Sequence, residues 1–160
     1  MKTNLVTIAV ALMLGTPAFA QDKPVADKAK PAATAEQLEA SFKAILTKAT
    51  MSGLWCSVKD GKLGPEKEDQ YNIVSANKLD GAKWVINTRI KMYNREVVVP
   101  IPVEVKWAGD TAVLIVDKLQ YPGGGTYSAR VLFYEQTYAG TWSGGDHGGL
   151  MSGVITNEKE

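Results

Sequence analysis

Asp146 and His147 are the neighbouring residues best suited to chemistry, and they lie in the glycine-rich segment Ser143–Gly149. A carboxylate can orient an imidazole for general-base catalysis. Adjacent loop residues rarely reach that geometry, and no motif marks a nucleophile. The glycines also let a backbone approach a ligand closely. We therefore expect a plain hairpin loop, with ligand contact by Asp146 and His147 as the second interpretation and catalysis as the third.

A charged pair is expected on two strands that flank the segment Pro122–Gly125. With these residues as the loop, the register places Asp117 opposite Arg130, and opposite charges on paired strands attract. The same face would carry Ile115, Leu119, Leu132 and Tyr134. We expect a solvated ion pair on the sheet surface. The alternative is a polar anchor inside a barrel, where it would fix the head group of an otherwise apolar ligand.

Aromatic side chains are concentrated near the last strands of the chain. They are Tyr121, Tyr127, Tyr134, Tyr138 and Trp142. Aromatic rings can stack on sugars or planar ligands, although most large side chains in a small domain fill its core. Among them, Tyr134 and Trp142 join the candidate ligand-binding residues.

Composition excludes several functions. A single Cys and a single His are too few for a disulfide framework or a Cys/His zinc site. We therefore expect no metal and no cofactor. The formal charge of +1 argues against nucleic-acid binding driven by charge. The lone thiol, Cys56, falls within a strand-like segment and is expected to be a buried small hydrophobe.

The first residues predict export. Lys2 precedes the apolar run Leu5–Leu14, and Ala18-Phe19-Ala20 ends in the small-x-small pattern of a signal peptide cleaved after Ala20. The apolar run is too short to span a bilayer, which takes about 20 residues. We expect an extracytoplasmic protein, periplasmic or secreted, with no transmembrane segment in the mature chain. Residues 21–33 are rich in Ala, Lys, Asp and Pro and predict a disordered linker.

The elements that position these residues are one helix and a run of strands. Thr34 and Gln37 fit a capping box at the start of an amphipathic helix over residues 34–50. From residue 51 to residue 157 the apolar period changes to two, and short turns separate about eight strand-like segments. The clearest strand contains Pro100 and Pro102, which remove two hydrogen-bond donors. We therefore expect this segment to be bent, bulged or partly unpaired along one side. We predict a mainly β protein, an eight-stranded antiparallel up-and-down barrel or strongly curled sheet preceded by one helix.

Two short patterns carry resemblances. Gly53-Leu54-Trp55 resembles the Gly-x-Trp signature of the calycins, the lipocalin and avidin-like barrels, in which the Gly lets strands approach and the Trp plugs one barrel end. A second copy, Gly140-Thr141-Trp142, lies near the end of the chain rather than its beginning, so no ligand contacts are carried over. The stretch from Val97 to Ile155 is also similar to a group of uncharacterised secreted bacterial proteins with matching Pro-Ile-Pro, Trp-Ala-Gly-Asp and Ala-Gly-Thr-Trp segments. That similarity implies no function.

Three functional hypotheses follow. The first is an exported, non-catalytic barrel that binds a small apolar or amphipathic molecule. The second is an interaction module with a filled barrel that docks an envelope protein. The third is an enzyme that uses Asp146 and His147. A cavity of roughly 300 Å³ or more would favour the first hypothesis.

Overall fold

The computed structural model describes residues 32–92, 95–120 and 125–157. The signal peptide and most of the linker expected from the sequence lie outside these residues. One helix, α1 (Ala35–Leu46), precedes nine strands. The strands are β1 (Ala49–Lys59), β2 (Lys62–Leu63), β3 (Lys67–Asp80), β4 (Lys83–Met92), β5 (Arg95–Ala108), β6 (Thr111–Gln120), β7 (Thr126–Tyr134), β8 (Thr137–Gly144) and β9 (His147–Asn157).

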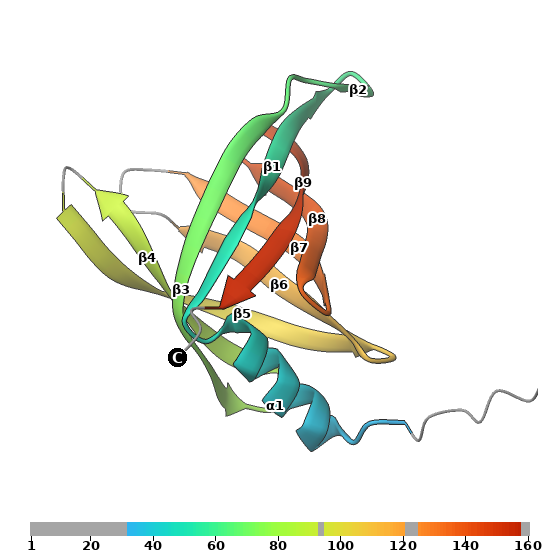
Figure 1. Cartoon of the computed structure of the whole chain (residues 1–160). Coiled ribbons are helices and arrows are strands. Elements are labelled where there is room, and N and C mark those ends of the chain that lie inside the picture. The colour runs from blue at the N-terminus through green and yellow to red at the C-terminus, as the bar shows by residue number, and fades with distance from the viewer. Residues whose placement is uncertain (1–31, 93–94, 121–124, 158–160) are drawn as a thin grey trace, which may run out of the picture. The chain divides into compact units, whose positions relative to one another are not determined.

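The eight long strands form a closed antiparallel barrel, which confirms the fold predicted from the alternating pattern (Figure 1). Each long strand pairs with the next along the chain, and β1 pairs with both β3 and β9 to close the sheet. The two-residue strand β2 pairs only with Val58 and Lys59 at the end of β1. Short turns explain this order, since a chain that reverses within two residues pairs with its own preceding strand. The turn after β5 is Gly109-Asp110, and Gly109 has a positive φ of 65°.

One seam of the barrel is incomplete. Strands β5 and β6 pair only from Glu104 to Ala108 and from Thr111 to Ile115. The Val105 N–H donates to the Ala82 carbonyl on the β4 side, so the alternate residues Pro100 and Pro102 turn their backbone nitrogens toward β6. These nitrogens carry no hydrogen. The expectation that the prolines leave this strand partly unpaired along one side is therefore confirmed.

Helix α1 packs against one end of the barrel, as Figure 1 shows. Phe42 makes edge-to-face contacts with Trp84, Trp107 and Phe133, with ring centroids 5.3, 6.2 and 5.6 Å away. Leu46, the other buried side chain of the helix, is 1% exposed. The barrel therefore covers the apolar face of the amphipathic helix. No helix in the described ranges has the length and apolar character needed to cross a membrane.

The two ends of α1 are set by different contacts. The capping box is present, because Thr34 and Gln37 each accept a backbone hydrogen bond from the other. The helix ends at Leu46, so the expected boundary at residue 50 was wrong. Lys48 has a positive φ of 53° that turns the chain into β1. The Asn157 amide donates to the carbonyls of Ala44, Ile45 and Thr47, which satisfies acceptors at the end of the helix.

Candidate functional site

The barrel encloses a cavity of about 540 Å³. Its inner part, next to α1, is apolar and includes Leu46, Ile73, Val103, Leu114 and Phe133. These side chains are inward-facing members of the alternating strands, except for Leu46, which comes from the helix. They are all buried, whereas His147 and Tyr127 at the other end of the cavity are exposed. The cavity therefore has an apolar floor at the helix and a mouth at the opposite end of the barrel.

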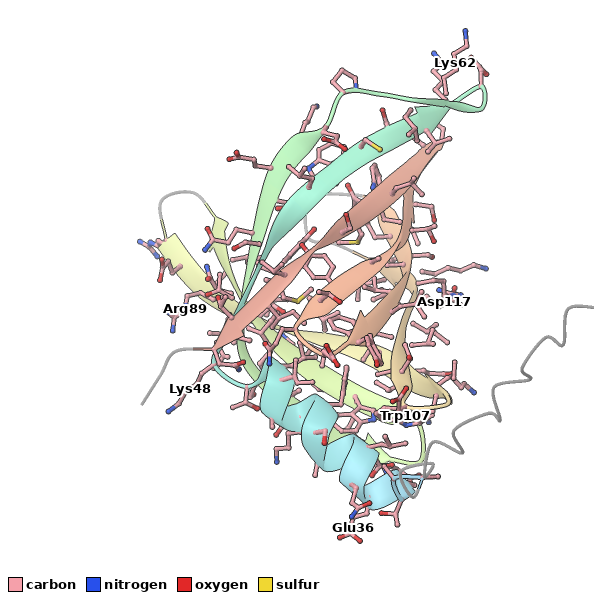
Figure 2. All side chains as sticks on the ribbon, turned by 45° about the vertical axis from the view of Figure 1, so that its right-hand side comes forward. Glu36, Lys48, Lys62, Arg89, Trp107 and Asp117 are labelled. Atoms are coloured by element: carbon pink, nitrogen blue, oxygen red, sulfur yellow. The ribbon has the colours of Figure 1, made fainter. Side chains whose placement is uncertain are left out.

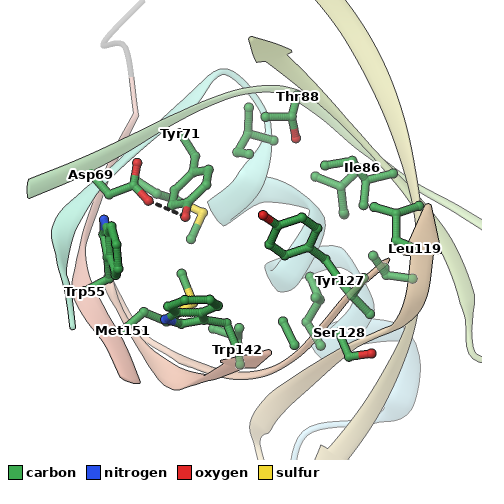
Figure 3. Close-up of a pocket in the computed structure, with 18 of the residues that line it drawn as sticks. Trp55, Asp69, Tyr71, Ile86, Thr88, Leu119, Tyr127, Ser128, Trp142 and Met151 are labelled. Carbon is green, nitrogen blue, oxygen red and sulfur yellow. Dashed lines mark hydrogen bonds between the residues drawn. The ribbon is translucent and has the colours of Figure 1, made fainter. Parts of the chain in front are cut away.

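Polar and aromatic side chains surround the mouth (Figure 3). They are Trp55, Asp69, Tyr71, Tyr127, Trp142 and His147. Of the candidate residues from the sequence, Trp142 and His147 are in this set. Asp69, Tyr71 and Trp55 were not predicted as site residues. The alternation of Asp69, Tyr71 and Ile73 along β3 could have revealed the first two as residues of the inner face.

Asp69 and Tyr71 form a hydrogen-bonded pair on the inner face of β3. The Tyr71 hydroxyl donates to Asp69 Oδ2 at 2.5 Å, and the Gln70 N–H donates to Oδ1 at 2.9 Å. Residues two apart on a strand share a face, which brings the two side chains together. The result is a half-buried carboxylate on the wall of a largely apolar cavity.

Three rings continue this wall around the mouth. Trp55 and Trp142 meet edge to face with centroids 5.4 Å apart, and His147 meets Trp142 in the same way at 5.4 Å. The Lys67 ammonium lies 4.9 Å from the centre of the Trp55 ring. The buried indole Nε1 of Trp142 has no hydrogen-bond partner in the described part of the chain.

The glycine-rich segment is a tight hairpin. Gly145 and Asp146 connect β8 to β9, and the positive φ of 62° at Gly145 fits the first position of a type II′ turn. His147 Nδ1 lies 3.2 Å from Asp146 Oδ1, and this hydrogen bond lowers the pKa of the Asp146 carboxyl. The Asp146 side chain is fully exposed and does not line the cavity. The pair therefore exists, but in the described residues no hydroxyl or thiol is hydrogen-bonded to His147.

The expected register of β6 and β7 was wrong. Arg130 pairs with Ile115 rather than Asp117, because a bulge with positive φ at Lys118 interrupts β6. The Lys118 N–H donates a hydrogen bond to the Ser128 hydroxyl instead of to the backbone of β7. Asp117 and Arg130 still form an ion pair, at 3.5 Å, and both side chains are exposed. Figure 2 shows Asp117 outside the barrel, so the pair is the solvated one and the idea of an anchor inside the lumen was wrong.

The remaining aromatic candidates are dispersed. Tyr134 is half exposed on the outer face and does not line the cavity. Tyr138 is buried in the core, Tyr127 lines the mouth, and Tyr121 lies outside the described residues. Cys56 is 6% exposed, as expected for a small buried hydrophobe.

Gly53 and Gly140 bring neighbouring strands close together. A methyl group on Gly53 would lie 2.1 Å from the Ser152 carbonyl oxygen, and one on Gly140 would lie 2.1 Å from that of Arg130. The Tyr138 hydroxyl fits beside Gly53 and the glycine paired with it, Gly153. Both Gly-x-Trp segments thus combine a close approach of strands with an aromatic ring at the mouth.

The Tyr138 hydroxyl predicts a loss of stability at alkaline pH. Burial raises the pKa of this hydroxyl above its ordinary value of 10.0, and the Asp69 carboxylate raises it further. The folded state then holds the proton more tightly than the unfolded chain, so stability falls as the pH rises from 10 through the folded pKa. We expect the melting temperature of Tyr138→Phe to fall less steeply above about pH 10 than that of the wild type. If the melting temperatures of Tyr138→Phe and the wild type fell equally steeply with pH, the raised pKa of Tyr138 would not be the cause. Tyr134→Phe is the control, because it removes the hydroxyl of an exposed tyrosine.

No group of three or more Cys, His, Asp or Glu side chains in the described ranges is placed to hold a metal ion. The fold and site define an eight-stranded barrel with a one-ended internal cavity. Comparisons of the chain with protein-family models, curated proteins and solved structures found no match.

Proposed function

We propose that this chain is an exported, non-catalytic β-barrel protein that binds a small apolar or amphipathic molecule in its cavity. The observation that carries the proposal is the cavity itself. Its volume of about 540 Å³ lies within the range of roughly 300–1,000 Å³ typical of small-molecule sites. Such sites are mostly apolar with a few polar groups that fix orientation, which is the distribution found between floor and mouth. The signal-like first residues support export.

The incomplete seam between β5 and β6 also supports the proposal that the cavity binds an apolar ligand. Inward-facing side chains of β5 and β6, Ile101, Val116 and Leu119, line the cavity on both sides of the seam. Val97 lies further along the same face of β5 and is exposed. A hydrocarbon chain longer than the cavity could extend along this apolar strip.

Filling the cavity is expected to weaken binding. Nile red, a neutral apolar dye, reports binding by its fluorescence, and native mass spectrometry of the exported protein reports a ligand that co-purifies with it. Ala129 lines the cavity, so Ala129→Trp should weaken dye binding at least about tenfold by occupying the ligand's volume. Ala139→Trp, on the exposed face of the paired strand β8, should leave it unchanged. Absence of dye binding to the wild type, or equal binding to both variants, would contradict the proposal.

A second candidate function, docking of an envelope protein, is favoured by a separate observation. Exposed apolar side chains lie on the outer face of three strands, β1, β7 and β9, namely Leu54, Leu132, Tyr134, Leu150 and Val154. Surface patches of this kind mark interaction sites when they are contiguous. This function would be preferred if the wild-type cavity bound no apolar dye.

A further inference from the structure

We propose that the ligand is an amphiphilic amine whose ammonium group is held at the mouth by Asp69, between the rings of Tyr71 and Trp142. This inference rests on the proposed function, because it assumes that the cavity binds a ligand. It specifies the class of that ligand. The hydrocarbon part would occupy the apolar floor next to α1.

The charge at the cavity wall is the first argument. Asp69 is the only carboxylate among the described residues that line the cavity, and no Lys or Arg lines it. No nitrogen of Lys, Arg or His in the described ranges lies within the 4.0 Å ion-pair distance of this carboxylate. Its hydrogen bonds come from neutral donors, Tyr71 and Gln70. A half-buried anion without a cationic partner is best completed by a cation.

The aromatic rings beside Asp69 are the second argument. The faces of Trp and Tyr attract ammonium groups, most strongly where water is excluded. Lys67, which does not line the cavity, already lies over the Trp55 ring at 4.9 Å. The rings of Tyr71 and Trp142 lie across the mouth from each other (Figure 3). Asp69 and Trp55 lie next to each other at one side of the space between these two rings. A ligand cation placed among them would meet both a negative charge and aromatic surface.

The opposite head group is disfavoured at this mouth. A carboxylate would lie beside Asp69, and like charges at close range repel. Among the described residues that line the cavity, only the His147 imidazole could carry a compensating positive charge, because no Lys or Arg is among them. The apolar floor, which includes Ile73, Val103 and Leu114, accepts the same hydrocarbon tail in either case. The head group therefore decides the selectivity.

Calorimetric titration with three ligands of equal chain length tests this selectivity. The ligands are decyltrimethylammonium and decanoate, each below its micelle concentration, and 1-decanol below its solubility limit, all at neutral pH. We expect the wild type to bind the ammonium roughly tenfold or more tightly than the alcohol, and decanoate the most weakly. A quaternary ammonium donates no hydrogen bond, so its preference would report charge and ring contacts alone.

The matched variant is Asp69→Asn, which keeps the size of the side chain and an acceptor for Tyr71. It should lower the affinity for decyltrimethylammonium by roughly tenfold and leave that for 1-decanol unchanged. Asp146→Asn removes a carboxylate that faces solvent on the nearby turn and should change neither affinity. A thermal melt shows that each variant is folded, and the ligand preference of the wild type tests the inference without any variant.

The outcomes separate the two proposals. If none of the three ligands binds the wild type, the proposed function fails. If 1-decanol binds as tightly as the ammonium, or Asp69→Asn binds the ammonium as well as the wild type does, the amine inference is overturned while ligand binding stands.

Discussion

Replacing Gly149 with Ala is expected to lower the free energy of unfolding by about 3 kcal/mol, near the upper end of what added core atoms usually cost. A methyl group at this position would lie 1.8 Å from the Cys56 carbonyl oxygen and 2.9 Å from Trp142 Nε1. The oxygen belongs to the backbone of β1, the strand that closes the barrel against β9. It cannot move without separating the two strands. Urea denaturation followed by far-UV circular dichroism measures the change.

Gly61→Asn is the control for a glycine substitution in the same protein. Gly61 has a positive φ of 71°, which Asn tolerates better than most residues, and no atom lies within 4 Å of an added methyl group. We expect a cost below about 1 kcal/mol for this variant. If Gly149→Ala were as stable as Gly61→Asn, the close packing of β1 on β9 described above would be wrong.

Replacing Phe42 with Ala is expected to cost about 3–5 kcal/mol, the usual range for truncating a buried aromatic residue. Phe42 is 2% exposed, and its three edge-to-face contacts connect α1 to Trp84, Trp107 and Phe133. Without this ring the helix loses its main attachment to the barrel. Denaturation by urea gives the free energy, and near-UV circular dichroism reports the loss of fixed tryptophan environments.

Lys43→Ala separates the aromatic contact from a general effect on the helix. Lys43 is the neighbouring residue of α1, and its side chain is exposed. This variant should lie within about 0.5 kcal/mol of the wild type, as is usual for surface positions. Equal stabilities of Phe42→Ala and Lys43→Ala would show that the helix contributes little to the barrel.

Most of the fold could be predicted from local patterns. Alternating side chains identified the long strands, and short turns fixed their antiparallel order. The helix start was predicted to the residue, because Thr34 and Gln37 form a local capping box. The helix end was not, because it depends on a positive φ at Lys48 and on Asn157, which is distant in sequence.

The site was predictable only in part, since it is assembled by the closure of the barrel. Trp142 and His147 were identified because they are chemically distinctive residues in a turn region. Asp69 became visible only when β3 was seen to begin at Lys67, before the apolar part of the strand. The positions of Asp117 and Arg130 depended on one bulge residue, and a bulge leaves no clear signal in an alternating sequence.

The two prolines of β5 have a consequence for the contact of this protein with other copies of itself. A strand with a free edge invites edge-to-edge association, the first step of many β-aggregates. An incoming strand would find no N–H donor at Pro100 or Pro102, and at the start of β5 it would meet the charged Arg95 and Glu96. The same residues that keep the barrel seam open thus protect it from intermolecular pairing. The part of β5 without a paired neighbour is therefore also the part least suited to pairing with another copy of the chain.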